Sequence, residues 1–147
     1  MSTSLTRRSF LKTSALGTAA FSAASWQRVR GANDALRVAI VGFKGRGGDH
    51  IAGFRKIPGV RIVGLCDVDT RVLEGAVKKL KDDGYEAKGY KDVREVIADK
   101  DIDIISTATP NHWHSLITVW ACQANKDVYV EKPVSHNVWE GRQMVNA

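Results

Sequence analysis

Glycines and two cations follow an apolar run near the start of the chain. Residues 38–41 are Val-Ala-Ile-Val, and the segment after them reads Gly42-Phe43-Lys44-Gly45-Arg46-Gly47-Gly48. Such an apolar run is typical of a strand that is buried on both faces of a sheet. A pyrophosphate can bind to a helix N-terminus only where no side chain keeps the backbone away, so glycines permit that approach. The segment therefore predicts a phosphate-binding turn between a strand and a helix.

The spacing of the glycines fits a dinucleotide-binding fingerprint in part. The usual pattern is G-x-G-x-x-G, in which Gly42 and Gly47 fit the first and third positions. Lys44 stands where the second glycine is expected. We expect Gly45 and Gly48 to move the closest approach along the loop, and Lys44 or Arg46 to add a cation near the phosphate.

An acidic residue ends the second apolar run. Residues 60–66 read Val-Arg-Ile-Val-Gly-Leu-Cys, and Asp67 follows them, 25 positions after Gly42. A carboxylate near this offset binds the ribose hydroxyls of a dinucleotide. No arginine follows directly to hold a 2′-phosphate, so the sequence favours NAD over NADP. The alternative is that Asp67 or Asp69 simply caps the next helix.

Polar residues follow residues 102–108, which have the pattern of a buried strand. The segment reads Thr109-Pro110-Asn111-His112-Trp113-His114, and a helix is expected from there to about residue 124. In open α/β sheets, ligands bind at the carboxyl ends of the strands, so these residues are candidates for a binding site. Trp113 and Trp120 lie on the apolar stripe of that helix, which predicts core packing for both. A His-x-His pair alone is a poor ligand set, so no metal is expected.

The last apolar run, residues 127–130, ends in Glu131-Lys132-Pro133. Its carboxyl end is expected at the same edge of the sheet. Lys132 is therefore a candidate proton donor or substrate anchor. The alternative is that Glu131 and Lys132 form a solvated ion pair.

These segments must be positioned by an alternating series of strands and helices. Helical spacing of apolar residues predicts helices after residues 69, 92 and 110, and a further helix from residue 138. The order β-α-β-α-β predicts an α/β fold with a doubly wound, mostly parallel sheet.

Composition limits the other functions. A chain of 147 residues has the length of one domain. Its net charge is +6, of which residues 1–34 carry +4, so the rest is nearly balanced and nucleic acid is not expected as a partner. Cys66 and Cys122 lack the spacing of a metal site or a disulfide framework and are expected to be buried free thiols.

Residues 1–34 are interpreted as a leader and residues 35–147 as the folded domain. The leader contains Thr6-Arg7-Arg8-Ser9-Phe10-Leu11-Lys12, which is similar to a twin-arginine export signal, followed by an alanine-rich run. We expect folding in the cytoplasm, then export to the periplasm by the twin-arginine translocation machinery. The alternative is an ordinary disordered basic N-terminus.

Together, the strand ends resemble those of a known family. The Gly42 to Gly48 loop, Cys66-Asp67, Thr109-Pro110-Asn111 with His114, and Glu131-Lys132-Pro133 are similar to the N-terminal domain of the glucose-fructose oxidoreductase, inositol dehydrogenase and rhizopine catabolism (Gfo/Idh/MocA) family. The resemblance covers residues 37–147. It implies a Rossmann domain that binds NAD or NADP, and hydride exchange at a sugar or polyol carbon.

The resemblance also implies roles for single residues. Gly42, Gly45, Gly47 and Asp67 would hold the adenosine and pyrophosphate half of the cofactor. Thr109, Pro110, Asn111 and His114 would line the middle of the cofactor groove. Glu131 and Lys132 would lie beside the nicotinamide, with Lys132 polarising or protonating the substrate oxygen.

Members of the family carry a second domain, which completes the catalytic site and often forms the contact of a homo-oligomer. That domain is not in this sequence, and the sheet is expected to be incomplete at the C-terminus, so we interpret the chain as a truncated form. Two alternatives to a dehydrogenase stay open. One is an NAD-dependent glycosidase that works by oxidation and elimination, and the other is a non-catalytic nucleotide-binding fragment.

Overall fold

The computed structural model describes residues 35–147, and the predicted twin-arginine leader lies outside the described residues. The strands are β1 (Leu36–Val41), β2 (Val60–Cys66), β3 (Lys88–Tyr90), β4 (Ile104–Thr107) and β5 (Asp127–Val130). The helices are α2 (Gly47–Phe54), α3 (Thr70–Asp82), α4 (Val93–Ala98), α5 (Asn111–Gln123) and α6 (Val138–Asn146). Strands and helices alternate along this part of the chain, as the sequence predicts.

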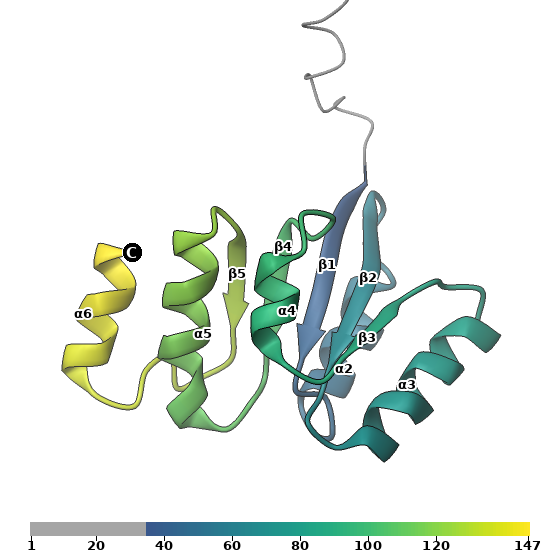
Figure 1. The fold of residues 1–147 in the computed structure, drawn as a ribbon, viewed down its shortest axis with the longest axis horizontal. Coiled ribbons are helices and arrows are strands. Elements are labelled where there is room, and N and C mark those ends of the chain that lie inside the picture. The colour runs from purple at the N-terminus through teal and green to yellow at the C-terminus, as the bar shows by residue number, and fades with distance from the viewer. Residues whose placement is uncertain (1–34) are drawn as a thin grey trace, which may run out of the picture. The chain divides into compact units, whose positions relative to one another are not determined.

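The five strands form one parallel sheet in the order β3-β2-β1-β4-β5. The chain proceeds from β1 through β2 to β3, then returns to the other side of β1 with β4 and β5 (Figure 1). The register aligns the strand ends, because Val41 pairs with Cys66 and Thr107, and Thr107 pairs with Val130. The polar residues that follow these strands therefore emerge at one edge of the sheet.

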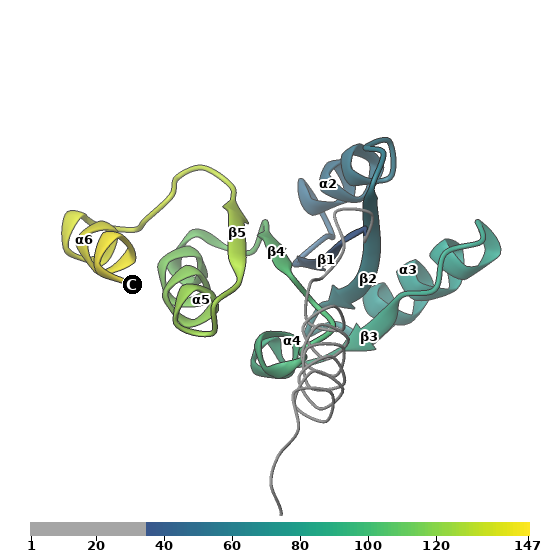
Figure 2. The same cartoon turned by 90° about the horizontal axis from the view of Figure 1, so that it is seen from above.

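Helices cover both faces of the sheet, as expected of a doubly wound fold (Figure 2). Val38 and Ile40 of β1 belong to the core beneath α2 and α3. Ala39 and Val41 belong to the core beneath α4 and α5. All four side chains are at most 3% exposed, which explains the unbroken apolar run that the sequence has at residues 38–41.

Short side chains cap the helices where the sequence predicts helix starts. Asp69 accepts a hydrogen bond from the backbone N–H of Arg71 at the start of α3, and Asp92 does the same for Arg94 at the start of α4. Gly84 follows α3 with a φ of +84°, a left-handed conformation that glycine adopts without strain. Helix α5 begins directly after Pro110, without a side-chain cap.

The structure contradicts the sequence prediction for one of the two cysteines. Cys66 is buried as predicted, but Cys122 is only half-buried, so the prediction of two buried thiols is wrong for Cys122.

Helix α6 has no buried residue, and Trp139 on it is 69% exposed. Within residues 35–147, no helix is both long and apolar enough to cross a membrane.

Candidate functional site

The turn between β1 and α2 can be built only with glycine at two positions. Gly42 has a φ of +74°, and a Cβ atom on it would lie 2.9 Å from the Cγ2 atom of Thr109. At Gly47, a Cβ atom would lie 2.0 Å from the carbonyl oxygen of Gly42. The first and third glycines of the fingerprint therefore let the end of β1 approach both the loop after β4 and the first turn of α2.

The middle of the turn has a different character. Lys44, Gly45 and Arg46 are all exposed. A Cβ atom on Gly45 would meet nothing within 4 Å. The protein's own packing thus requires neither a glycine at position 45 nor one at position 44, and Lys44 fits there without a clash. The open space over Gly45 lies at the start of α2, where a helix N-terminus favours an anion.

Asp67 follows β2 at the same edge of the sheet and is half-buried. Its Oδ1 accepts from the N–H of Asp69 at 3.0 Å, and its Oδ2 accepts a long bond from the N–H of Phe43 at 3.4 Å. These backbone donors hold the carboxylate beside the glycine turn. Asp69, and not Asp67, caps α3, so the alternative role of helix capping holds for Asp69 only. The carboxylate of Asp67 instead lines a groove.

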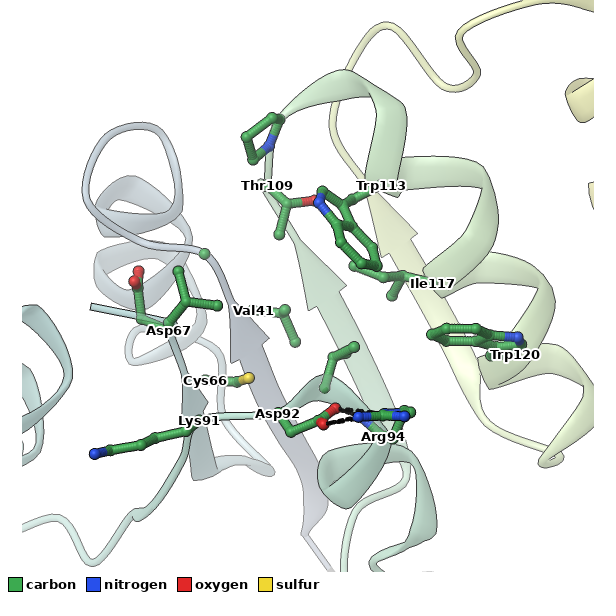
Figure 3. Close-up of a pocket in the computed structure, with 14 residues that line it drawn as sticks. Val41, Cys66, Asp67, Lys91, Asp92, Arg94, Thr109, Trp113, Ile117 and Trp120 are labelled. Atoms are coloured by element: carbon green, nitrogen blue, oxygen red, sulfur yellow. Dashed lines mark hydrogen bonds and ion pairs between the residues drawn. The ribbon is translucent and has the colours of Figure 1, made fainter. Parts of the chain in front are cut away.

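This groove lies between the strand ends and the helices α4 and α5, and has a volume of about 580 Å³. Figure 3 shows Asp67 on one side of it and Trp113, Ile117 and Trp120 on the other, with Val41 and Cys66 between them. Other lining residues are Gly42, Val68, Lys91, Asp92, Val93, Arg94, Thr109 and Pro110. An apolar groove with the carboxylate of Asp67 at its rim can accept a flat ring joined to a polyhydroxylated group.

The tryptophans of α5 differ from the sequence prediction. Trp113 is 40% exposed and Trp120 is half-buried, and both line the groove. The helical stripe is real, since Ile117 and Ala121 are fully buried. Trp113 stands at the start of that stripe, in the first turn of α5, where it lines the groove. Core packing was therefore the wrong prediction for Trp113.

Asp92 and Arg94 form an ion pair on the α4 side of the groove (Figure 3). The guanidinium of Arg94 and its backbone N–H lower the pKa of Asp92 to about 2. Asp92 is therefore ionised at neutral pH, and its charge is balanced by Arg94. Of the carboxylates that line the groove, Asp67 is the one without a paired cation among the described contacts.

Glu131, at the end of β5, joins a second cluster of polar side chains. Its Oε1 accepts from Nε of Arg46 at 2.9 Å and lies 3.0 Å from Nε2 of His50. The hydrogen bond from His50, followed by that from Arg46, lowers the pKa of Glu131 to about 2. Glu131 therefore pairs with the glycine turn and α2 rather than with Lys132, so the predicted alternative of a Glu131–Lys132 ion pair is wrong. Lys132 itself is exposed.

The cluster contains two residues that the sequence analysis missed. His50 is 6% exposed, and its Nδ1 lies 2.8 Å from the hydroxyl of Ser106, which is fully buried. The sequence does contain a signal for His50. Its helical spacing from Gly47, Ile51 and Phe54 places it on the inner face of α2. Ser106, His50 and Glu131 have the connectivity of a hydrolytic triad, but a fully buried serine cannot reach a substrate.

His114 also differs from its expected place. Its ring is 1% exposed, so it does not line the groove. Nε2 lies 2.9 Å from the carbonyl oxygen of Thr109, and Nδ1 lies 2.7 Å from that of Pro133. His114 thus connects the loop after β4 to the segment after β5, where the Lys132–Pro133 peptide bond is cis. Thr109 and Pro110 line the groove, and Asn111 is exposed at the start of α5.

Comparison with known proteins agrees with this geometry. The sequence profile of the GFO_IDH_MocA family, an oxidoreductase family with an NAD-binding Rossmann fold, matches residues 36–147. Glycosyl hydrolase family 109 protein 2 from Shewanella sp. (strain ANA-3) is 34% identical over 158 residues, covering 91% of this chain and 35% of that protein. Inositol 2-dehydrogenase from Salmonella typhimurium is 31% identical over 113 residues, covering 76% of this chain and 33% of that protein.

Solved structures share the fold. Myo-inositol 2-dehydrogenase from Lactobacillus plantarum matches with a TM-score of 0.69 and 32% identity, over 77% of this chain and 32% of that one. WlbA dehydrogenase from Chromobacterium violaceum, in complex with NADH and UDP-GlcNAcA, matches with a TM-score of 0.71 and 25% identity, over 78% and 32%. The chain spans about a third of the length of the relatives it matches.

Proposed function

Because the chain belongs to the Gfo/Idh/MocA family of oxidoreductases, with an NAD-binding Rossmann fold, we propose that it supplies the cofactor-binding part of an enzyme that transfers hydride at a sugar or polyol carbon. The main support for this proposal is the turn between β1 and α2, in which residue 47 can only be glycine. Asp67 is held beside this turn, at the end of the neighbouring strand. This pair of features matches the needs of a pyrophosphate and an adenosine ribose.

Each half of the dinucleotide has residues that fit it. The pyrophosphate would be held at the start of α2, by backbone N–H groups beside Gly45 and by the cations of Lys44 and Arg46. Asp67 would accept hydrogen bonds from the ribose hydroxyls. Its unpaired negative charge would repel a 2′-phosphate, which favours NAD over NADP. The apolar groove beside Trp113 would take the adenine ring.

The other half of the cofactor would lie toward β5. NAD, when bound there, accepts a hydride from the substrate carbon or returns one to it. Lys132 is exposed at that strand end, so its ammonium can bind a substrate hydroxyl and exchange a proton with it. Glu131 is committed to Arg46 and His50, which leaves the proton-transfer role to Lys132.

Two alternative functions compete with that of a dehydrogenase. The glycosyl hydrolase family 109 relative, which is 34% identical to this chain, supports a glycosidase that oxidises and re-reduces its substrate. The dehydrogenase would accumulate NADH, whereas the glycosidase would release sugar without a net change in NADH absorbance. A non-catalytic nucleotide-binding role would give neither signal.

For the leader, we propose export of the folded protein to the periplasm by the twin-arginine translocation machinery. The support is the pair Arg7-Arg8 followed by Ser9, Phe10, Leu11 and Lys12. Replacing Arg7 and Arg8 by lysine should keep a tagged protein in the cytoplasm. Export of the double variant at the normal level would contradict the proposal.

Calorimetric titration of the chain with NAD and NADP tests the cofactor assignment. We expect NAD to bind and NADP to bind more weakly by at least about tenfold, the factor that corresponds to 1.4 kcal/mol. Absence of NAD binding by the folded chain would contradict the proposed function, and tighter binding of NADP would contradict the role of Asp67.

A further inference from the structure

We propose that His50 and His114 are positioning residues that fix Lys132 from opposite faces of the sheet. The proposal rests on the proposed function, in which Lys132 meets the substrate. His50 lies on α2, which packs on the face of β1 that contains Val38 and Ile40. His114 lies on α5, which packs on the other face (Figure 2). Lys132 stands between the residues that these two histidines bind.

The first connection runs through Glu131. His50 contacts Ser106 of β4 with Nδ1 at 2.8 Å and Glu131 with Nε2 at 3.0 Å. The other carboxylate oxygen of Glu131, Oε2, accepts from the backbone N–H of Lys132 at 3.2 Å. The ring of His50 is itself held, since it is 6% exposed and lies edge-on to Tyr129 with ring centroids 5.3 Å apart. A buried side chain in β4 is thereby linked to the Lys132 amide.

The second connection runs through Pro133. Nδ1 of His114 lies 2.7 Å from the carbonyl oxygen of Pro133, and Nε2 lies 2.9 Å from that of Thr109. The ring is 1% exposed, which shields both contacts from water. The residue after Lys132 is thereby tied to the end of β4.

Lys132 depends on these connections because the sheet ends just before it. The last ladder contact of β5 is the bond from the N–H of Glu131 to the carbonyl oxygen of Thr107, at 3.0 Å. Lys132, Pro133 and Val134 are exposed. An exposed turn without sheet pairing is normally mobile. A displacement of about 1 Å at a reacting group can cost a hundredfold in rate, so anchoring such a turn has a functional consequence.

The two nitrogens of histidine allow a test in which the contacts are removed one at a time. An asparagine amide reaches the position of Nδ1, and a glutamine amide reaches that of Nε2. His50→Asn therefore retains the Ser106 contact and loses Glu131, whereas His50→Gln retains Glu131. At His114 the roles of the two variants are exchanged, because Nδ1 is the nitrogen that contacts Pro133. His114→Gln therefore loses the contact with Pro133, and His114→Asn retains it. The matched control is His112→Gln, because His112 is an exposed histidine on α5, the helix that contains His114.

The measurement is the NMR order parameter of the Lys132 backbone amide in the full chain without cofactor. We expect a value of about 0.85 in the wild type, His50→Gln, His114→Asn and His112→Gln, and a value below about 0.6 in His50→Asn and His114→Gln. A role in packing alone would make both substitutions at one site behave alike. A rigid Lys132 amide in both contact-losing variants, or equal effects within each pair, would overturn the proposal.

Binding adds a second readout. The affinity for ADP-ribose should be unchanged in the folded variants, whereas the ratio of NADH affinity to ADP-ribose affinity should fall about 3- to 10-fold in His50→Asn and His114→Gln, as expected for one lost hydrogen bond. If those two variants do not fold, Glu131→Ala removes the first connection from its other end, and a rigid Lys132 amide in it would overturn the proposal. Failure of the wild type to bind NADH would instead refute the proposed function.

Discussion

The carbonyl oxygen of Gly42 lies 2.0 Å from the position that a Cβ atom on Gly47 would occupy. No side chain fits into that distance, so the end of β1 and the start of α2 approach each other only because residue 47 is glycine. Gly45, two residues earlier, has nothing within 4 Å of its own Cβ position. The fold therefore requires glycine at position 47 but not at position 45, where the proposed phosphate site would require it.

This difference predicts opposite outcomes for two alanine variants. Gly47→Ala should lower the free energy of unfolding by about 3 kcal/mol or more, because overpacking against backbone cannot be relieved by a side-chain rotation. Gly45→Ala should leave the free energy of unfolding within about 0.5 kcal/mol of the wild type but weaken NAD binding, since its methyl group would enter the phosphate space. Urea denaturation and calorimetry measure both. Full NAD affinity in Gly45→Ala would contradict the placement of the phosphate.

Asp67→Ala should weaken NAD binding by on the order of 1.5 to 3 kcal/mol, the contribution of a hydrogen bond to a charged group. Asp67→Asn retains an acceptor for the backbone N–H groups of Phe43 and Asp69, and so separates the charge from the local structure. The same titration with NADP should show a smaller loss, because the repulsion of the 2′-phosphate disappears.

Asp69→Ala is the matched control for that experiment. It removes the cap of α3 and should cost about 0.5 to 2 kcal/mol of stability without changing NAD affinity. Equal loss of affinity in the Asp67 and Asp69 variants would assign both residues to the fold and neither to the ribose.

Trp113→Ala should weaken ADP-ribose binding by about 1 to 3 kcal/mol, the range measured when an aromatic ring that stacks on a base is removed. Trp113 is 40% exposed on the wall of the groove, opposite Asp67. Trp139→Ala changes a tryptophan that is 69% exposed on α6, and should leave the affinity unchanged. Similar affinities in the two variants would exclude Trp113 from the adenine site.

The fold could be predicted from the sequence because its signals are local. Residues 60–66 and 127–130 match β2 and β5, and the helix predicted from residue 138 begins there. Apolar runs, Asp69 and Asp92 as caps, and Gly84 after α3 each act within a few residues of the chain. The parallel order of the strands then follows from the alternation of strands and helices.

The side-chain clusters could not be predicted because they join residues that are distant in sequence. His50 and Glu131 are separated by 81 positions and meet only because β1, β4 and β5 are adjacent in the sheet. His114 has the residue type of a ligand, but the sequence does not show which way its ring points. Trp113 belongs to an apolar stripe, and periodicity alone does not show that its ring lines a groove instead of the core.

Glu131 makes the stability of the domain depend on pH in a defined range. Hydrogen bonds from His50, Arg46 and the N–H of Lys132 lower its pKa from 4.5 to about 2 in the folded chain. Between these two values the unfolded chain binds more protons than the folded chain, so stability rises with pH there. The contribution of Glu131 should be fully present above about pH 4.5 and should be lost as the pH falls toward 2.

The measurement is the difference in the free energy of unfolding between the wild type and Glu131→Gln, from urea denaturation at a series of pH values. The difference should favour the wild type at neutral pH and shrink steadily through the acidic range, because protonated Glu131 and glutamine are both neutral. Glu86→Gln, at an exposed site outside this cluster, is the control that accounts for general charge effects. A difference that does not change with pH would mean that Arg46 and His50 do not stabilise the Glu131 carboxylate.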